Sequence, residues 1–256
     1  MGSYLSVSGL RTYYETHGSG EPVVLLHGGM STAESWGPQT EALSRHYEVF
    51  VPERRGHGRT PDVEGRIDYP IMAEDTMAFM DAVGLPPAHL VGWSDGAVVG
   101  ALVALRRPEL VRKLVLIGQY FTADGLRPEG RALFEAAEAL AGMFRDTYAA
   151  VSPDGADHFP VVFGKMLRMW QEDPGLGTEQ LSGIKAPTLV MQGDDDMVAV
   201  EHSAAVAKAV PGAQLAVVPG TSHALPVEKP DLVNRLILDF LAAWQPPKFL
   251  PLRPAV

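Results

Sequence analysis

The sequence predicts an α/β protein built on a mostly parallel β-sheet with helices on both of its faces. Two observations lead to this fold class. Short runs rich in Val, Leu and Ile alternate along the 256 residues with longer segments whose apolar residues recur every three or four positions. The first pattern is typical of strands and the second of amphipathic helices. The strand-like runs are continuously apolar, as expected for strands that are covered on both faces.

The pattern of apolar runs predicts eight strands. The first two, at residues 4–7 and 11–16, are joined by Ser-Gly-Leu and should form an antiparallel hairpin. Six buried strands follow at residues 22–26, 48–51, 89–93, 113–117, 187–192 and 214–218. The helices between them are expected at residues 40–46, 71–83, 95–107, 200–210 and 231–244.

A long interval without strand patterns follows the sixth predicted strand. It contains two helical segments, 129–150 and 157–172, separated by a Ser-Pro-Asp-Gly turn. A structureless loop of this length is uncommon in compact domains. We therefore expect a core formed by residues 1–119 and 187–256, with a small helical cap formed by residues 120–186.

The charge and residue content exclude several functional classes. The chain carries 21 Lys and Arg against 31 Asp and Glu, which gives a formal charge of −10. Such an acidic surface repels phosphate backbones, so a nucleic-acid partner is not expected. The absence of cysteine excludes a thiolate nucleophile and any disulfide framework, and it is compatible with a cytoplasmic location.

No membrane segment is expected either. The first residues lack the basic segment and the apolar run of a signal peptide. The longest apolar stretch, residues 97–105, is too short to span a bilayer. We therefore expect a soluble protein without a membrane partner, whose Pro-rich end at residues 245–256 is irregular. The sequence does not predict an oligomeric state.

The pentapeptide Gly92-Trp93-Ser94-Asp95-Gly96 matches the pattern Gly-x-Ser-x-Gly. A strand-like run precedes it and a helix-like run follows, which is the setting of a nucleophile elbow. Glycine fits both flanking positions because neighbouring backbone leaves no room there for a Cβ atom. Ser94 is therefore the candidate nucleophile, and an ordinary turn with a capping serine is the alternative.

A serine hydroxyl is a poor nucleophile until a base takes its proton. His223 follows the last predicted strand, and ligands bind at the carboxyl ends of parallel strands. The base needs a carboxylate that orients it. Asp194, Asp195 and Asp196 follow the preceding predicted strand, and the order Ser, Asp, His is the one expected for an elbow serine. The residues alone do not choose among these acids, and their spacing does not match an EF-hand.

With these landmarks the chain resembles the α/β-hydrolase superfamily over nearly its whole length, and in particular its serine hydrolases and carboxylesterase-like members. The resemblance rests on the elbow together with His27-Gly28-Gly29, Arg55-Gly56-His57-Gly58, Gly193-x-x-Asp196-x-Val198 and Gly220-x-x-His223. It implies that Asp196 is the acid of the triad, with Asp195 as the fallback. Glu53 departs from the family, which often has Asp at that position.

The resemblance also implies an oxyanion hole formed by the backbone N–H groups of Asp95 and Gly29, with Met30 as an alternative donor. The Gly-Trp-Ser-Asp-Gly form is similar to that of valacyclovir hydrolase-like members, which implies that Asp95 faces a substrate amino group. Substrate contacts are expected from Met30, Trp93, Asp95, Phe144 and Trp170. The last two belong to the predicted cap, where aromatic residues at helical spacing are also typical of packing.

We therefore expect an enzyme that hydrolyses a carboxylic ester, or a related acyl bond of a small molecule, through an acyl-enzyme intermediate. No metal and no cofactor is implied. Lactonase, thioesterase, amidase, C–C bond hydrolase and cofactor-free haloperoxidase-like activities could use the same triad. A ligand-binding protein on a hydrolase scaffold is the alternative from another class.

Overall fold

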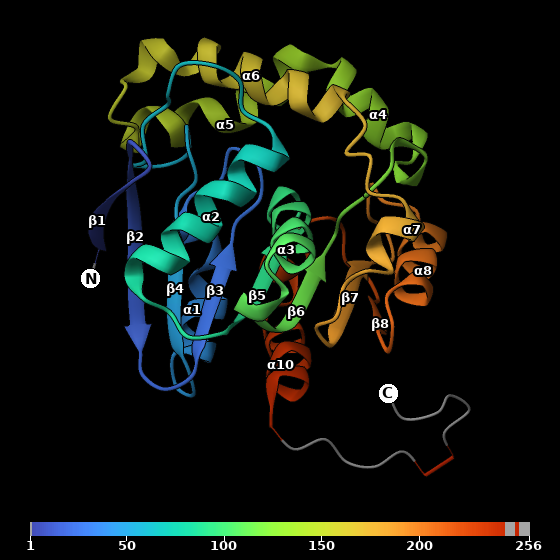
Figure 1. Cartoon of the computed structure of the whole chain (residues 1–256). Coiled ribbons are helices and arrows are strands. Elements are labelled where there is room, and N and C mark those ends of the chain that lie inside the picture. Colours follow the sequence, from blue (N-terminus) through green and yellow to red (C-terminus); the bar gives the residue numbers. More distant parts are fainter. Residues whose placement is uncertain (1, 244–248, 251–256) are drawn as a thin grey trace.

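The computed structural model describes residues 2–243 and 249–250, and it confirms an eight-stranded sheet flanked by helices (Figure 1). The strand order is β1-β2-β4-β3-β5-β6-β7-β8. β1 pairs antiparallel with β2, and β2 with β4, whereas all other neighbours are parallel. The strands are β1 Gly2–Val7, β2 Leu10–Gly18, β3 Pro22–Leu26, β4 Glu48–Pro52, β5 Ala88–Trp93, β6 Val111–Ile117, β7 Thr188–Gly193 and β8 Gln214–Val218.

The central strands bury apolar side chains on both faces of the sheet, whereas β1 and β8 at its two edges are largely exposed. The prediction of a buried strand at 214–218 is therefore wrong, because β8 is an edge strand whose side chains Leu215 and Val217 are exposed. In the central strand β3, for example, Val23 and Leu25 join one hydrophobic cluster, and Val24 and Leu26 join the other. The helices divide in the same way, as Figure 1 shows for α2 and α3 in front of the sheet and α1 behind it. Helices α2 (Tyr69–Val83), α3 (Asp95–Arg106) and α8 (Val200–Ala209) cover one face, and α1 (Gly37–Leu43) and α10 (Pro230–Leu241) cover the other.

The start of helix α2 is set by its N-cap. The Asp68 carboxylate accepts a hydrogen bond of 2.9 Å from the backbone N–H of Ile71. Pro70, in the first turn, has no N–H that would need a partner. Asp68 and Pro70 thus fix the start of helix α2 at Tyr69. The Tyr69 hydroxyl donates a hydrogen bond to Asp95, next to Ser94.

Between β6 and β7 the chain forms helices instead of strands, as predicted. Figure 1 shows helices α4 (Pro128–Glu135), α5 (Ala137–Val151) and α6 (Phe159–Gln171) arching over one edge of the sheet, and we call these three helices the cap. The prediction of one continuous helix at 129–150 is wrong, because the backbone leaves the helical region at Ala136 (φ −82°, ψ 52°). The high helix propensity of the surrounding alanines hides this break in the sequence. The domain boundaries at 120–186 stay a prediction.

The last helix predicted from the sequence, at residues 231–244, corresponds to α10. Helix α10 ends at Leu241, and most of the expected irregular segment 245–256 lies outside the described residues.

Within the part of the chain that the structure describes, no helix combines the length and the apolar character needed to cross a bilayer.

We expect the contact between α3 and the end of β3 to be essential for stability. A Cβ atom on Gly96 would lie 1.9 Å from the backbone oxygen of Leu26, so Gly96→Ala should lower the free energy of unfolding by about 3 kcal/mol or more. Gly100→Ala, one turn further along the same helix, is the control, because its Cβ would meet only side-chain atoms at 3.3 Å or beyond. Urea denaturation of both variants tests this, and equal stabilities would contradict it.

Candidate active site

Ser94 lies at a sharp turn between β5 and α3. Its backbone dihedrals are φ 55° and ψ −124°, a left-handed conformation that a residue with a side chain rarely adopts. The turn is held by a hydrogen bond of 2.8 Å from the Ser94 N–H to the backbone oxygen of Ile117 on β6. It also requires glycine at position 92, where a Cβ would lie 2.2 Å from the Gly96 oxygen. Such strain is characteristic of functional sites.

Asp196 and His223 lie on the loops that follow β7 and β8, and their side chains are hydrogen-bonded. The distance from His223 Nδ1 to Asp196 Oδ1 is 2.9 Å, and the Asp196 side chain is fully buried. When the carboxylate accepts this hydrogen bond, Nδ1 is the donor, and in the neutral imidazole Nε2 is the nitrogen that can accept a proton. Trp93 Nε1 donates to the His223 backbone oxygen at 2.9 Å and so anchors the loop.

The other two acids of the Asp-Asp-Asp segment have different roles. Asp194 accepts a hydrogen bond of 3.1 Å from the Thr221 N–H and thereby joins the loops after β7 and β8. The Asp195 side chain is 88% exposed and lies 3.7 Å from Arg127 Nη1. Asp196 is thus the acid of this segment that contacts the imidazole.

Ser94 and His223 line a cavity of about 350 Å³ that extends between the sheet domain and the cap. The predicted contact residues Trp93, Asp95, Phe144 and Trp170 also line it, whereas Met30 is buried in the core and does not. Most of the lining is apolar or aromatic. The residues are Gly28, Gly29, Ser31, Trp93, Ser94, Asp95, Tyr120, Leu133, Phe134, Leu140, Met143, Phe144, Trp170, Met197, Ser222, His223 and Ala224.

The loop after β3 passes close to the serine. A Cβ on Gly28 would lie 3.4 Å from the Ser94 Cβ. The Gly28 backbone oxygen accepts hydrogen bonds from His27 Nδ1 at 2.7 Å and from Arg54 Nη2 at 3.1 Å. The peptide bond between Gly28 and Gly29 is trans and planar, so the Gly29 N–H points in the direction opposite to the Gly28 carbonyl oxygen. It therefore points away from the side chains of His27 and Arg54. The role of this N–H as an oxyanion donor stays a prediction.

Asp95 is a buried carboxyl group beside the nucleophile. It is 2% exposed, and its two carboxylate oxygens accept hydrogen bonds of 2.9 Å, one from the Tyr69 hydroxyl and one from Trp170 Nε1. Burial raises the pKa of the Asp95 carboxyl, and the nearby Arg54 guanidinium acts in the opposite direction. The expected contact between Asp95 and a substrate amino group stays a prediction. The sequence contains no local signal for the Tyr69 contact.

Two further buried residues order the loops around the site. His27 is fully buried, and its Nε2 accepts a hydrogen bond of 3.2 Å from the Arg54 N–H. Burial lowers the pKa of His27 well below its ordinary value, which keeps the ring neutral. Glu53, the departure from the family pattern, accepts hydrogen bonds from the Ala33 N–H at 3.0 Å and from Arg59 Nη1 at 2.8 Å.

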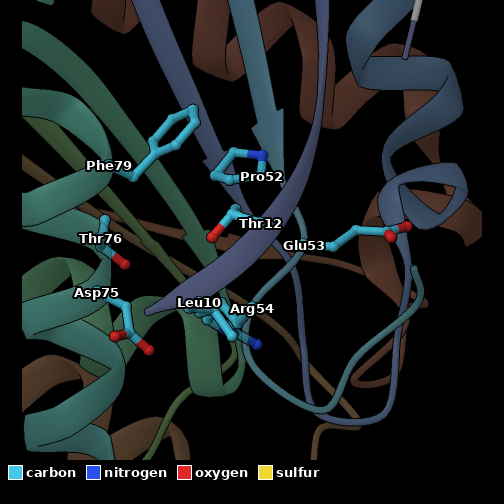
Figure 2. Close-up of a pocket in the computed structure, with 8 residues that line it drawn as sticks. All are labelled: Leu10, Thr12, Pro52, Glu53, Arg54, Asp75, Thr76 and Phe79. Atoms are coloured by element: carbon cyan, nitrogen blue, oxygen red, sulfur yellow. The ribbon is translucent and has the colours of Figure 1, made fainter. Parts of the chain in front are cut away.

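A second cavity lies between β2, the end of β4 and helix α2, as the eight side chains in Figure 2 show. Its volume is about 10 Å³, which is the size of one water molecule. It shares no lining residue with the cavity at Ser94. We therefore assign it no part in substrate binding.

A parallel sheet with helices on both faces and a serine at a strained strand–helix turn is the architecture of an α/β hydrolase. The comparison with known families agrees, because the alpha/beta hydrolase family matches residues 23–236. The chain belongs to this family.

Individual relatives support an enzymatic function. RutD of Azorhizobium caulinodans, a relative named for carbamate hydrolysis, is 30% identical over 251 residues, which cover 89% of this chain and 94% of RutD. Serine hydrolase BPHL of Mus musculus is 28% identical over 93% of this chain and 85% of its own. The structure of the meta-cleavage product hydrolase CumD from Pseudomonas fluorescens superposes with a TM-score of 0.79 at 25% identity, covering 94% of this chain and 97% of CumD. The protein is therefore an α/β-hydrolase enzyme.

We expect His57 to make the fold sensitive to acid. This residue is 1% exposed, its Nδ1 donates to the Arg55 backbone oxygen, and burial lowers its pKa to about 3. Between pH 6.5 and 3 the unfolded chain therefore binds a proton that the folded chain does not. Stability is lost as the pH falls through this window, by about 2 kcal/mol from pH 7 to pH 5.

The variant His57→Asn tests this assignment, because its amide can still donate to the same carbonyl but does not titrate. Urea denaturation at pH 7 and pH 5 should show a smaller loss of stability on acidification than in the wild type. His46→Asn, at an exposed histidine, serves as the control. An unchanged loss in His57→Asn would show that this histidine does not cause the acid sensitivity.

Proposed function

We propose that the protein hydrolyses a carboxylic ester, or a related acyl bond, with Ser94 as nucleophile, His223 as general base and Asp196 as the acid that orients it. One observation carries the proposal. Ser94 and the Asp196-bonded imidazole of His223 line the same apolar cavity, which has the volume of a small-molecule site.

In the proposed mechanism, His223 Nε2 takes the proton of the Ser94 hydroxyl while Oγ attacks the carbonyl carbon of the substrate. Asp196 stabilises the imidazolium that forms. The negative charge that develops on the carbonyl oxygen is bound by the N–H groups of Asp95 and Gly29, and the orientation of the Gly28–Gly29 peptide supports this role. His223 then protonates the leaving alcohol, and a water molecule activated by the same imidazole releases the acyl group.

The lining of the cavity favours uncharged, apolar substrates. It contains no Lys or Arg, and its acid is Asp95. A carboxylate on the substrate would lose its hydration without gaining a cationic partner in this lining. The substrate would be a small molecule of the cytoplasm, a location with which the cysteine-free composition is compatible. Lactones, thioesters, amides and C–C bonds with the same apolar character remain alternatives for the same triad.

Labelling with a fluorophosphonate tests the nucleophile and separates an enzyme from a ligand-binding protein. Ser94→Ala should lose the label and at least about 10⁴-fold of the ester-hydrolysis rate. Ser31→Ala removes another serine from the same cavity and should still be labelled. A wild-type protein that is never labelled would favour the ligand-binding alternative.

A pair of esters of similar size tests the charge preference. We expect kcat/KM for p-nitrophenyl pentanoate to exceed that for the p-nitrophenyl monoester of succinic acid by at least about tenfold, which corresponds to 1.4 kcal/mol. The uncatalysed hydrolysis of each ester is measured in parallel and subtracted. Equal values of kcat/KM would contradict the preference for uncharged substrates.

A further inference from the structure

We infer that Trp170 of the cap is a positioning residue for the oxyanion hole, and that it acts through Asp95 and Gly29. This inference rests on the proposed function, because it concerns the two residues whose N–H groups should bind the oxyanion. It couples the position of the cap to the catalytic competence of the core.

The first observation is the hydrogen bond between cap and core. Trp170, in the last turn of α6, is 8% exposed, and its Nε1 lies 2.9 Å from Asp95 Oδ2. Asp95 is the first residue of α3 and directly follows Ser94. The indole N–H therefore fixes the side chain of the residue whose backbone N–H is the expected first donor of the hole.

The second observation is the packing of Gly29, the expected second donor. A Cβ atom built on Gly29 would lie 2.4 Å from Asp95 Oδ2 and 2.4 Å from Trp170 Cζ2. The backbone of Gly29 therefore packs directly against the carboxylate and against the indole ring. One cap side chain thus contacts both segments that should form the hole.

The third observation is that the indole is held firmly within the cap. Phe134 stacks on it with ring centroids 5.7 Å apart, and Phe144 and Phe163 lie at 6.3 Å and 6.2 Å. The Tyr120 hydroxyl donates to the Trp170 backbone oxygen at 3.3 Å. A change in the position of α6 would therefore be transmitted to Asp95 and Gly29.

Charge explains why this contact matters for catalysis. A carboxylate next to an oxyanion hole would oppose the negative charge that develops there. In the structure, the Tyr69 hydroxyl and the Trp170 indole each hold one of the Asp95 oxygens. Without the indole N–H, one carboxylate oxygen would be unpaired, and the Gly29 loop would lose its packing partner.

The variant Trp170→Phe tests the inference because it keeps an aromatic ring and removes the N–H. For a positioning residue, kcat should fall by about 10- to 100-fold for both p-nitrophenyl acetate and p-nitrophenyl pentanoate, with KM changing little, since small displacements of catalytic groups have effects of this size. For a residue that only lines the cavity, KM for the pentanoate should rise while turnover of the acetate stays the same. That second result would overturn the inference.

Two further variants complete the experiment. Phe144→Leu changes the same aromatic cluster and cavity. A phenylalanine side chain cannot hydrogen-bond to Asp95, and no atom of Phe144 is among the three nearest to a Cβ built on Gly29, so the effect of this substitution should be larger on the pentanoate than on the acetate. Asp95→Asn leaves one accepting oxygen for the two donors Tyr69 and Trp170, so adding Trp170→Phe to it should cost much less than in the wild-type background. Additive effects of the two substitutions on kcat would overturn the inference.

Failure of this inference can be told apart from failure of the proposed function. If Ser94 is not the nucleophile, Ser94→Ala keeps the fluorophosphonate label or the wild type is never labelled, and Ser94→Ala has no effect on ester turnover. If only the positioning role is wrong, labelling and the loss of activity in Ser94→Ala are both observed, and Trp170→Phe behaves as a lining variant.

Discussion

The close contact of helix α3 with strands β3 and β5 is the constraint on which the site depends. The chain must pass from strand to helix within one residue, which forces Ser94 into a left-handed conformation. This is possible because Gly92 and Gly96 let backbone atoms approach where a Cβ atom would lie about 2 Å from them. The same approach brings the loop after β3 beside the serine, so one packing contact positions both the nucleophile and the expected oxyanion loop.

The sheet topology brings the remaining groups to the same place. Strands β5, β6, β7 and β8 are consecutive neighbours and run parallel, so their carboxyl ends share one edge of the sheet. Ser94, Asp196 and His223 each follow one of these strands. Residues far apart in the sequence therefore lie close together in the structure, because the order of the parallel strands decides which loops are adjacent.

Much of this arrangement could be predicted from the sequence, because strands, helices and the elbow depend on local patterns. The choice of Asp196 required the family resemblance, since the three adjacent acids differ only in where the loop directs them. Asp194 points to the Thr221 N–H, and Asp195 points to solvent. The partners of Asp95 were beyond prediction, because Tyr69 is 26 positions away and Trp170 is 75 positions away. Contacts over such separations follow from the packing of the cap and not from any periodicity.

The buried carboxylate of Asp95 links the chemistry of the core to the preference for substrate. Burying a charge is unfavourable unless its oxygens are paired, and here the partners come from α2 in the core and α6 in the cap. The indole N–H pairs with Asp95 Oδ2, which would otherwise border the cavity without a hydrogen-bond partner. The apolar character of the cavity and the geometry expected of the oxyanion hole therefore depend on the same hydrogen bond. A cap displaced from Asp95 would change the lining of the cavity and the surroundings of the expected oxyanion hole together.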